Sequence, residues 1–201
     1  MTEVKSTGFM GVLWALLSGL ISFAVGALVA AYLYTITDNF FIIAVGSGIG
    51  GLLLGLMLAM REKLPRLVLI CIAAVPVGVL ATFLLAGILE LFMPGGGPII
   101  LMDILSITFT GLVFGFISGL ALYGIRSSAL FALVTAIVAT PFGYLVALFN
   151  SGAPIKGIAL DLVSGLGITD VNLLAILMGL GSGLGLSIGL YRWGKSHPRH
   201  N

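Results

Sequence analysis

The residues that could carry chemistry in this chain are few, and they stand at the ends of apolar segments. The sequence holds nine Lys and Arg and seven Asp and Glu among 201 residues, and none of these charges falls at the centre of an apolar run. The deepest carboxylate, Glu90, comes two residues before the end of the run 67–92. Because charges within a membrane are costly and usually functional, a carboxylate at this depth could contact an ion or a solute. Together with Asp103, Lys156 and Asp161 it forms a predicted vestibule at one membrane face.

Catalysis and metal binding are not expected. Both histidines, His197 and His200, lie in the last five residues, and Cys71 is the only cysteine, so a thiolate metal cluster is excluded. Cys71 stands in an apolar stretch without a basic neighbour, which is typical of a buried structural cysteine. The run 46–50 has the letters of a phosphate loop, but it lies inside an apolar segment without a Lys. We therefore expect no enzyme activity, no catalytic residue, no metal and no cofactor.

The composition indicates a membrane protein. Apolar residues make up 60% of the chain and charged residues 8%, whereas soluble domains carry roughly 25% charged residues. Such a chain cannot cover a water-facing surface, so its main partner is predicted to be the lipid bilayer of the cell membrane. A net charge of +2 without a basic stripe gives no reason to expect nucleic acid binding.

Six apolar runs are long enough to cross a bilayer, which takes about 20 helical residues. Helices are expected because an open sheet would leave backbone groups unpaired in lipid. The predicted fold is therefore an all-α, multi-pass membrane protein with one six-helix domain over residues 1–201. The runs fall at about 9–34, 40–60, 67–92, 104–125, 128–149 and 172–191.

The charges predict the orientation of these spans. Eight of the nine Lys and Arg residues lie on one side of the predicted membrane, and Lys156 alone lies on the other. Five of the seven acidic residues share the side of Lys156. Because basic residues are retained in the cytoplasm, we expect both termini to be cytoplasmic. The acidic side would then face outward.

A recurring interval predicts an internal repeat. Arg61, Arg126 and Arg192 each close an apolar segment, at intervals of 65 and 66 residues. The same 65-residue shift carries Pro76 onto Pro141. Fixed intervals of this kind indicate repeated structural units. We predict three imperfect two-helix units, at about 1–63, 64–128 and 129–201, with the three arginines as topology anchors at the cytoplasmic ends of the even-numbered helices.

Small residues follow the predicted second, fourth and sixth helices at intervals of four. The chain has 29 glycines, about twice the average usage. Spacing of four places them in one stripe, and such stripes let helices approach closely in lipid. We therefore predict that these three helices pack together near the centre. The predicted helix-packing residues are Ser47, Gly51, Gly55, Gly111, Gly115, Gly119, Gly181, Gly185 and Gly189.

Pro76 and Pro141 stand near the middle of the third and fifth predicted helices. A proline removes one backbone donor and disturbs the carbonyl four residues earlier, so each position is a predicted kink or hinge. Thr140, immediately before Pro141, could satisfy a freed backbone group locally. Pro76 follows Val75 and has no such neighbour.

Two functions remain open from these observations. The first is a small-solute permease or the membrane subunit of a transporter, supported by the repeat and the paired prolines. The absence of central charge favours a neutral or weakly polar solute. Its outline of six spans is similar to that of vitamin-uptake substrate-binding components, although no motif of that family is present. The alternative is a non-transporting structural or assembly subunit, docking other membrane subunits through the small residues Ser18, Ser22, Gly26 and Ala30.

Overall fold

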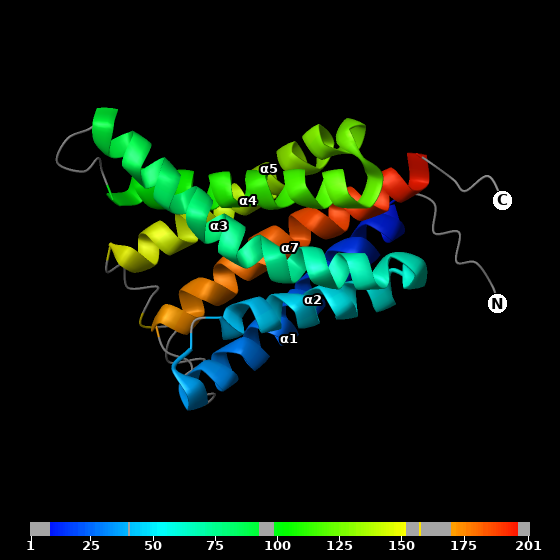
Figure 1. Cartoon of the computed structure of the whole chain (residues 1–201), viewed down its shortest axis with the longest axis horizontal. Helices are drawn as coiled ribbons and strands as arrows, with labels where there is room; N and C mark the ends of the chain where they lie inside the picture. Colours follow the sequence, from blue (N-terminus) through cyan, green and yellow to red (C-terminus); the bar gives the residue numbers. More distant parts are fainter. Residues whose placement is uncertain (1–8, 40, 93–98, 152–156, 158–169, 197–201) are drawn as a thin grey trace.

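The computed structural model describes residues 9–39, 41–92, 99–151, 157 and 170–196 of the chain. All regular elements in these residues are helical (Figure 1). Apart from the short 3₁₀ helix η1, they are α-helices, which pair every internal backbone group within one segment. The elements are α1 (Phe9–Thr37), α2 (Ile42–Met57), η1 (Arg61–Lys63), α3 (Leu64–Phe92), α4 (Ile99–Tyr123), α5 (Ile125–Asn150) and α7 (Asp170–Ser196).

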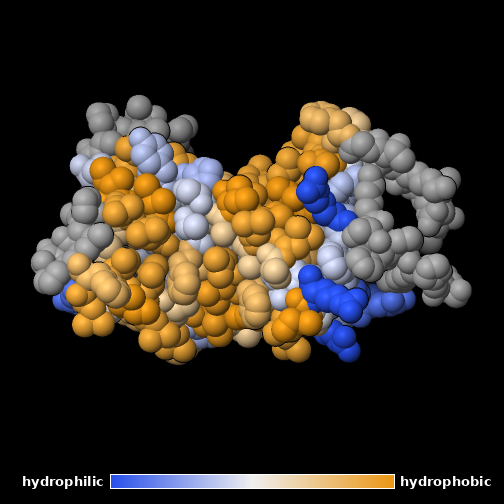
Figure 2. Space-filling view, turned by 90° about the horizontal axis from the view of Figure 1, so that it is seen from above, coloured by the Kyte–Doolittle hydropathy of each residue, from blue (hydrophilic) through white to orange (hydrophobic). Residues whose placement is uncertain are grey.

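The helices identify a multi-pass membrane protein. Four segments are long and apolar enough to cross a bilayer: Phe9–Thr37, Arg61–Phe92, Ile100–Tyr123 and Ile125–Asn150. At 16 residues, α2 is a shorter apolar helix. The face seen in Figure 2 is dominated by apolar residues. Large exposed apolar side chains suit contact with lipid tails. The prediction of six spans goes further than these four segments and stays a prediction.

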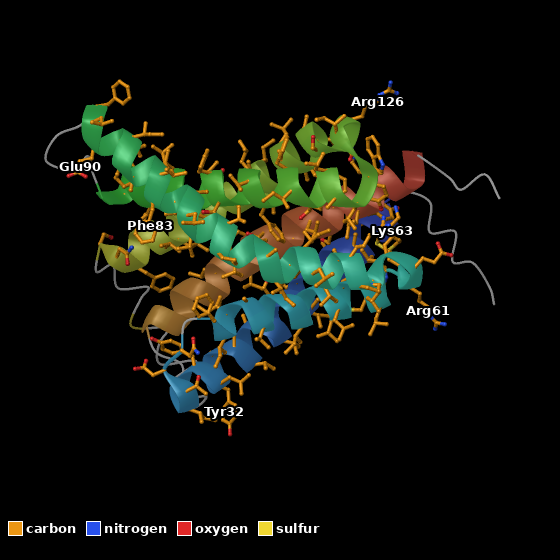
Figure 3. All side chains as sticks on the ribbon, viewed as in Figure 1. Tyr32, Arg61, Lys63, Phe83, Glu90 and Arg126 are labelled. Carbon is orange, nitrogen blue, oxygen red and sulfur yellow. The ribbon has the colours of Figure 1, made fainter. Side chains whose placement is uncertain are left out.

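Both described ends of the chain lie at one end of the molecule. Arg61, Lys63 and Arg126 lie at that end, and Glu90 lies at the opposite one (Figure 3). We call these the basic end and the acidic end. Successive helices run in opposite directions between the two ends (Figure 1). The links at the basic end are short, and between α4 and α5 a single residue, Gly124, turns the chain with a φ of 89° that a glycine adopts without strain.

The six α-helices form a ring in chain order. Each of α1 to α5 packs on the next helix, and α7 closes the ring by packing on both α5 and α1. In Figure 1, α7 runs between the α1–α2 pair and the α4–α5 pair. It also contacts α4 and, at fewer positions, α2.

The expected central meeting of the second, fourth and sixth helices is present only in part, because α7 contacts α4 and α2 but α2 and α4 do not meet in the part of the chain that the structure describes. In the described residues, α2 and α4 are not packed together to any extent, and their glycines face odd-numbered neighbours. A stripe of small residues shows where a backbone can approach, but it does not select the helix that approaches.

Residues related by the 65-residue interval also pack differently. Gly50 lies against Phe23 of α1, the helix before its own. Gly115, at the matching position, lies against Phe131 of α5, the helix after its own. The interval in the sequence is therefore not accompanied by equivalent packing at this position, and the threefold repeat stays a prediction from sequence.

Among the described residues, the apolar core is concentrated toward the basic end. Its main group, which we call the central cluster, joins residues of all six α-helices: Phe23, Leu54, Leu67, Ile70, Cys71, Ala74, Phe114, Leu122, Phe131, Leu186 and Leu190. A second group near the acidic end has only Ile107, Ala139 and Val146 with Leu177 beside them, all from α4, α5 and α7. Among the described residues, α1, α2 and α3 contribute nothing to this second group.

Candidate functional site

The most extensive helix contact in the described residues lies between α4 and α5. An added Cβ at Gly111 would stand 2.7 Å from the Ala139 Cβ, and one at Gly119 would stand 2.8 Å from the Ser128 Cα. At Gly115 the added atom would overlap the Phe131 carbonyl oxygen. Backbone approach this close is possible only where α4 has no side chain.

Glycines of α7 face α5 and leave equally little room. An added Cβ at Gly185 would stand 2.5 Å from the Thr135 Cα, and one at Gly189 would stand 2.8 Å from the Phe131 ring. At Gly181 the nearest atom would be 3.1 Å away, on the Phe142 ring. Thr135 therefore lies between α4 and α7, in a region that we call the α4–α5–α7 seam and define by Gly115, Thr135 and Gly185.

The predicted packing residues of α2 face α3. The Ser47 hydroxyl donates to the Cys71 carbonyl oxygen at 2.8 Å. An added Cβ at Gly51 would stand 2.6 Å from the Cys71 Sγ, and one at Gly55 would stand 2.5 Å from Leu64. These contacts fix the first half of α3 to α2.

Threonine pairs join α4 to both of its neighbours. The hydroxyls of Thr108 and Thr140 lie 3.0 Å apart between α4 and α5, and those of Thr82 and Thr110 lie 2.9 Å apart between α3 and α4. Thr108 and Thr110 therefore point to different helices, as their two-residue spacing requires. Hydroxyl pairs of this kind stabilise helix contacts in lipid by about 0.6 kcal/mol each.

Both prolines face away from the bundle, and hydroxyls support the backbone beside them. The Thr140 hydroxyl donates to the Ala136 carbonyl, five residues before Pro141, at 2.9 Å. The Cys71 carbonyl that accepts from Ser47 lies five residues before Pro76. At Pro141 the predicted hydroxyl of Thr140 is therefore used, but it binds the carbonyl one residue before the carbonyl that the proline leaves without a donor. At Pro76 the hydroxyl comes from a neighbouring helix, α2.

Toward its C-terminal end, after Thr82, α3 leaves the bundle (Figure 1). Its last buried residue is Ala81. The following segment, residues 83–92, we call the α3 tip. Phe83 is 71% exposed and Phe92 is 79% exposed, and an added Cβ at Gly87 would meet nothing within 4 Å. The first part of α3, up to Ala81, is therefore packed against its neighbours, whereas the α3 tip is largely exposed.

The residues of the predicted vestibule are only partly described. Glu90 lies exposed on the α3 tip (Figure 3). Asp103, at the start of α4, accepts a hydrogen bond of 2.8 Å from the Asn150 amide at the end of α5. No hydrogen bond joins Glu90 to Asp103 in the part of the chain that the structure describes. Lys156 and Asp161 lie outside the described residues.

At the basic end, aromatic residues close the bundle. The Lys63 Nζ lies 3.5 Å above the centre of the Tyr123 ring, which also contacts Phe131 and Trp193. The Lys63 ammonium also donates, at 3.5 Å, to the carbonyl of Leu122 near the end of α4, where the helix dipole favours a cation. Of the predicted topology anchors, Arg61, Arg126 and Arg192 are all exposed.

Two polar residues that the sequence did not single out are notable for lacking partners. Ser118 and Thr135 are fully buried, and among the described residues their hydroxyl oxygens have no hydrogen-bond partner. A buried polar atom without a partner costs about 1–3 kcal/mol, so each such group needs an explanation. Hydroxyl residues are frequent in these helices, and only the packing distinguishes this pair from the rest.

Comparisons with protein-family models, with curated proteins and with solved structures find no match for this chain. The site must therefore be interpreted from its own geometry.

Proposed function

We propose that the chain is a six-span permease, or the membrane subunit of a transporter, for a small neutral or weakly polar solute. The observation that carries this proposal is the uneven packing of the bundle along its length. The central cluster and the Tyr123 group fill the basic end. Among the described residues, the acidic end has a small apolar group and a helix tip that leaves its neighbours. A bundle closed at one end and loosely packed at the other is what alternating access requires of a single state.

The chemistry of the interior supports a neutral solute. Apart from the exposed Asp103–Asn150 bond at the acidic end, the polar side chains that pair between α3, α4 and α5 in the described helices are hydroxyls, in the Thr82–Thr110 and Thr108–Thr140 pairs. Hydroxyls donate and accept hydrogen bonds but cannot compensate a full charge removed from water. In the proposed orientation, solute enters from outside, at the acidic end, between the α3 tip and the rest of the bundle.

The alternative function, a structural or assembly subunit, required an exposed stripe of small residues on α1 to dock a partner. Ser18, Ser22, Gly26 and Ala30 of α1 are all buried inside the chain. An added Cβ at Gly26 would overlap the Gly46 carbonyl of α2, and Ala30 packs against the same glycine. The stripe is occupied by α2 and is not free to dock another subunit.

Solute flux through reconstituted protein tests the proposal directly. Proteoliposomes loaded with buffer would be exposed to a gradient of urea or glycerol and followed by stopped-flow light scattering. We expect re-swelling several-fold faster than in protein-free liposomes. If neither urea nor glycerol re-swells the proteoliposomes faster than protein-free liposomes, and fixed protein partners co-purify from the native membrane, the assembly subunit is supported instead.

Thiol labelling tests the proposed entry beside the α3 tip. Cys71 is the only cysteine, so Cys71→Ala gives a background without thiols. Leu85 is half-buried and lies four residues after the buried Ala81, whereas Leu84 is 68% exposed. We expect a membrane-impermeant thiol reagent, added on the acidic side, to label Leu85→Cys and to leave Leu84→Cys unlabelled in lipid. Labelling of Leu84→Cys alone would place water on the wrong face of α3.

A further inference from the structure

We infer that the part of α3 after Gly78, which includes the α3 tip, is a gate that swings away from α4 about Pro76 and Gly78. The Thr82–Thr110 pair holds this gate to α4 and can release it without losing a hydrogen bond. The role of a gate rests on the proposed permease, whereas the hinge and its release follow from contacts within the chain. Beyond the pair, no residue of α3 is buried.

The Thr82–Thr110 pair has more contacts than protons. The Thr82 Oγ1 lies 2.9 Å from the Gly78 carbonyl oxygen, and the Thr110 Oγ1 lies 2.8 Å from the Ser106 carbonyl oxygen. The two hydroxyl oxygens also lie 2.9 Å apart. Each hydroxyl carries one proton, and a carbonyl carries none. Only two of these three contacts can therefore be hydrogen bonds at the same time.

Release of the pair keeps the number of hydrogen bonds constant. While the helices touch, two bonds exist, whichever hydroxyl donates to the other. After separation, each hydroxyl donates to the carbonyl of its own helix, so two bonds remain. A polar group left unpaired in lipid would oppose separation, but none is created here. The gate therefore lacks the hydrogen-bond penalty that keeps other helix contacts closed.

The Thr108–Thr140 pair between α4 and α5 has the opposite arrangement. The Thr140 hydroxyl donates to the Ala136 carbonyl at 2.9 Å, so the 3.0 Å bond between the two threonines uses the Thr108 proton. Two contacts here have two protons, and separating the helices loses one bond. Similar residues thus fix α5 to α4 but hold α3 to α4 reversibly.

The hinge lies between the part of α3 that α2 holds and the Thr82–Thr110 pair. Before the hinge, the Ser47 hydroxyl donates to the Cys71 carbonyl at 2.8 Å. Pro76 has no N–H, so the helix lacks one of its own hydrogen bonds there. At Gly78 an added Cβ would meet only the methyl group of Thr110, at 3.1 Å. Helices bend at such positions, and the proline places the bend before the pair.

A comparison of valine variants tests the proton count. Thr82→Val and Thr110→Val each leave one bond at their pair and the double variant leaves none, so their losses in melting temperature should add. Thr140→Val removes two bonds, including the one that Thr108 donates, so adding Thr108→Val should lower the melting temperature no further. A shortfall from additivity at Thr82 and Thr110 as well would show a net bond between them and overturn the release.

Cross-linking tests the gate itself. In a Cys71→Ala background, Thr82→Cys with Thr110→Cys gives two thiols that copper phenanthroline can oxidise to a disulfide, which fixes the gate to α4. We expect oxidation to slow the flux of urea and glycerol several-fold and dithiothreitol to restore it. Each single cysteine variant, treated with the same oxidant, is the control. Equal flux in the oxidised and reduced forms of the pair overturns the gate.

Spin-label distances separate the hinge from the proposed function because they need no solute. Leu84 and Leu69, on either side of the hinge, are 68% and 65% exposed, and Ile137 of α5 is 62% exposed. Labelled cysteines at Leu84 and Ile137 should give a broad distance distribution, and those at Leu69 and Ile137 a narrow one. A broad distribution at Leu84 without protein-dependent flux in wild type supports the hinge and overturns the permease. Equally narrow distributions with normal flux overturn the hinge and leave the permease standing.

Discussion

The α4–α5 pair and the α3 tip are built from similar residues and packed in opposite ways. Along α4–α5, glycines bring the two backbones together, and Ser127 of α5 donates a hydrogen bond of 2.7 Å to the Gly119 carbonyl of α4. Along the α3 tip, Gly87 faces open space and no residue is buried. In lipid, apolar character does not hold helices together, because the solvent is equally apolar. Close backbone contact and interhelical hydrogen bonds separate the fixed region from the loosely packed one.

The largest expected effect compares a glycine of each region. In Gly115→Leu the new side chain collides with the Phe131 carbonyl, which cannot move aside as a flexible side chain can. We expect monodisperse protein to disappear in size-exclusion chromatography of a fluorescent fusion. Gly87→Leu adds a side chain where nothing lies within 4 Å, so its yield should match wild type. Normal folded yield from Gly115→Leu would show that the α4–α5 contact is not essential.

A phenylalanine pair gives a smaller and more graded test. Phe131 is 0% exposed in the central cluster, whereas Phe83 of the α3 tip is 71% exposed. Truncating a buried phenylalanine to alanine costs about 3–5 kcal/mol, and an exposed change usually stays within about 0.5 kcal/mol. We expect Phe131→Ala to lower the thermal unfolding midpoint strongly and Phe83→Ala to leave it nearly unchanged. Similar losses in both variants would mean that the α3 tip is packed after all.

The smallest expected effect concerns the hydrogen bond between Ser47 and the Cys71 carbonyl, which holds the part of α3 that precedes Pro76. Ser47→Ala removes the donor to the Cys71 carbonyl, and interhelical bonds in membranes average about 0.6 kcal/mol. Thr35→Ala is the matched control because its hydroxyl bonds only to the Tyr32 carbonyl of its own helix. Urea-induced or thermal unfolding of both variants should show a small loss for Ser47→Ala and none for Thr35→Ala. An equal loss in the two would remove Ser47 as an anchor of α3.

Part of the fold was predictable from local sequence. The six runs correspond to six α-helices in the structure because a long apolar segment in lipid has to pair its backbone internally. The break between the fourth and fifth runs was predicted slightly late, after residue 125: α4 ends at Tyr123, Gly124 turns the chain, and Arg126 lies inside α5. The identity of the helix partners was not predictable: α7, the sixth helix, contacts α4 and α2 as expected, but α2 and α4 do not pack on each other in the described residues. Small residues permit close approach by any neighbour.

The candidate site was less predictable than the fold. Glu90 and Asp103 drew attention because charge near a membrane is rare, and the structure leaves them at exposed positions or hydrogen-bonded at the bundle's end. Ser118 and Thr135 resemble many other hydroxyl residues in the sequence. A serine or threonine in a helix usually bonds a carbonyl of its own turn, so sequence spacing cannot show that a particular hydroxyl lacks a partner.

The sequence by itself determined that the chain suits lipid, which segments are helical, and that basic and acidic residues gather at opposite ends. Those properties follow from composition and from the hydrogen bonds within a single segment, which do not depend on neighbouring helices. Only the tertiary structure decided which helices touch, where α3 leaves the bundle and which hydroxyls are left unpaired. These depend on contacts between residues far apart in the chain, such as Gly115 with Phe131 and Ser47 with Cys71. No spacing along one helix encodes the identity of the helix packed against it.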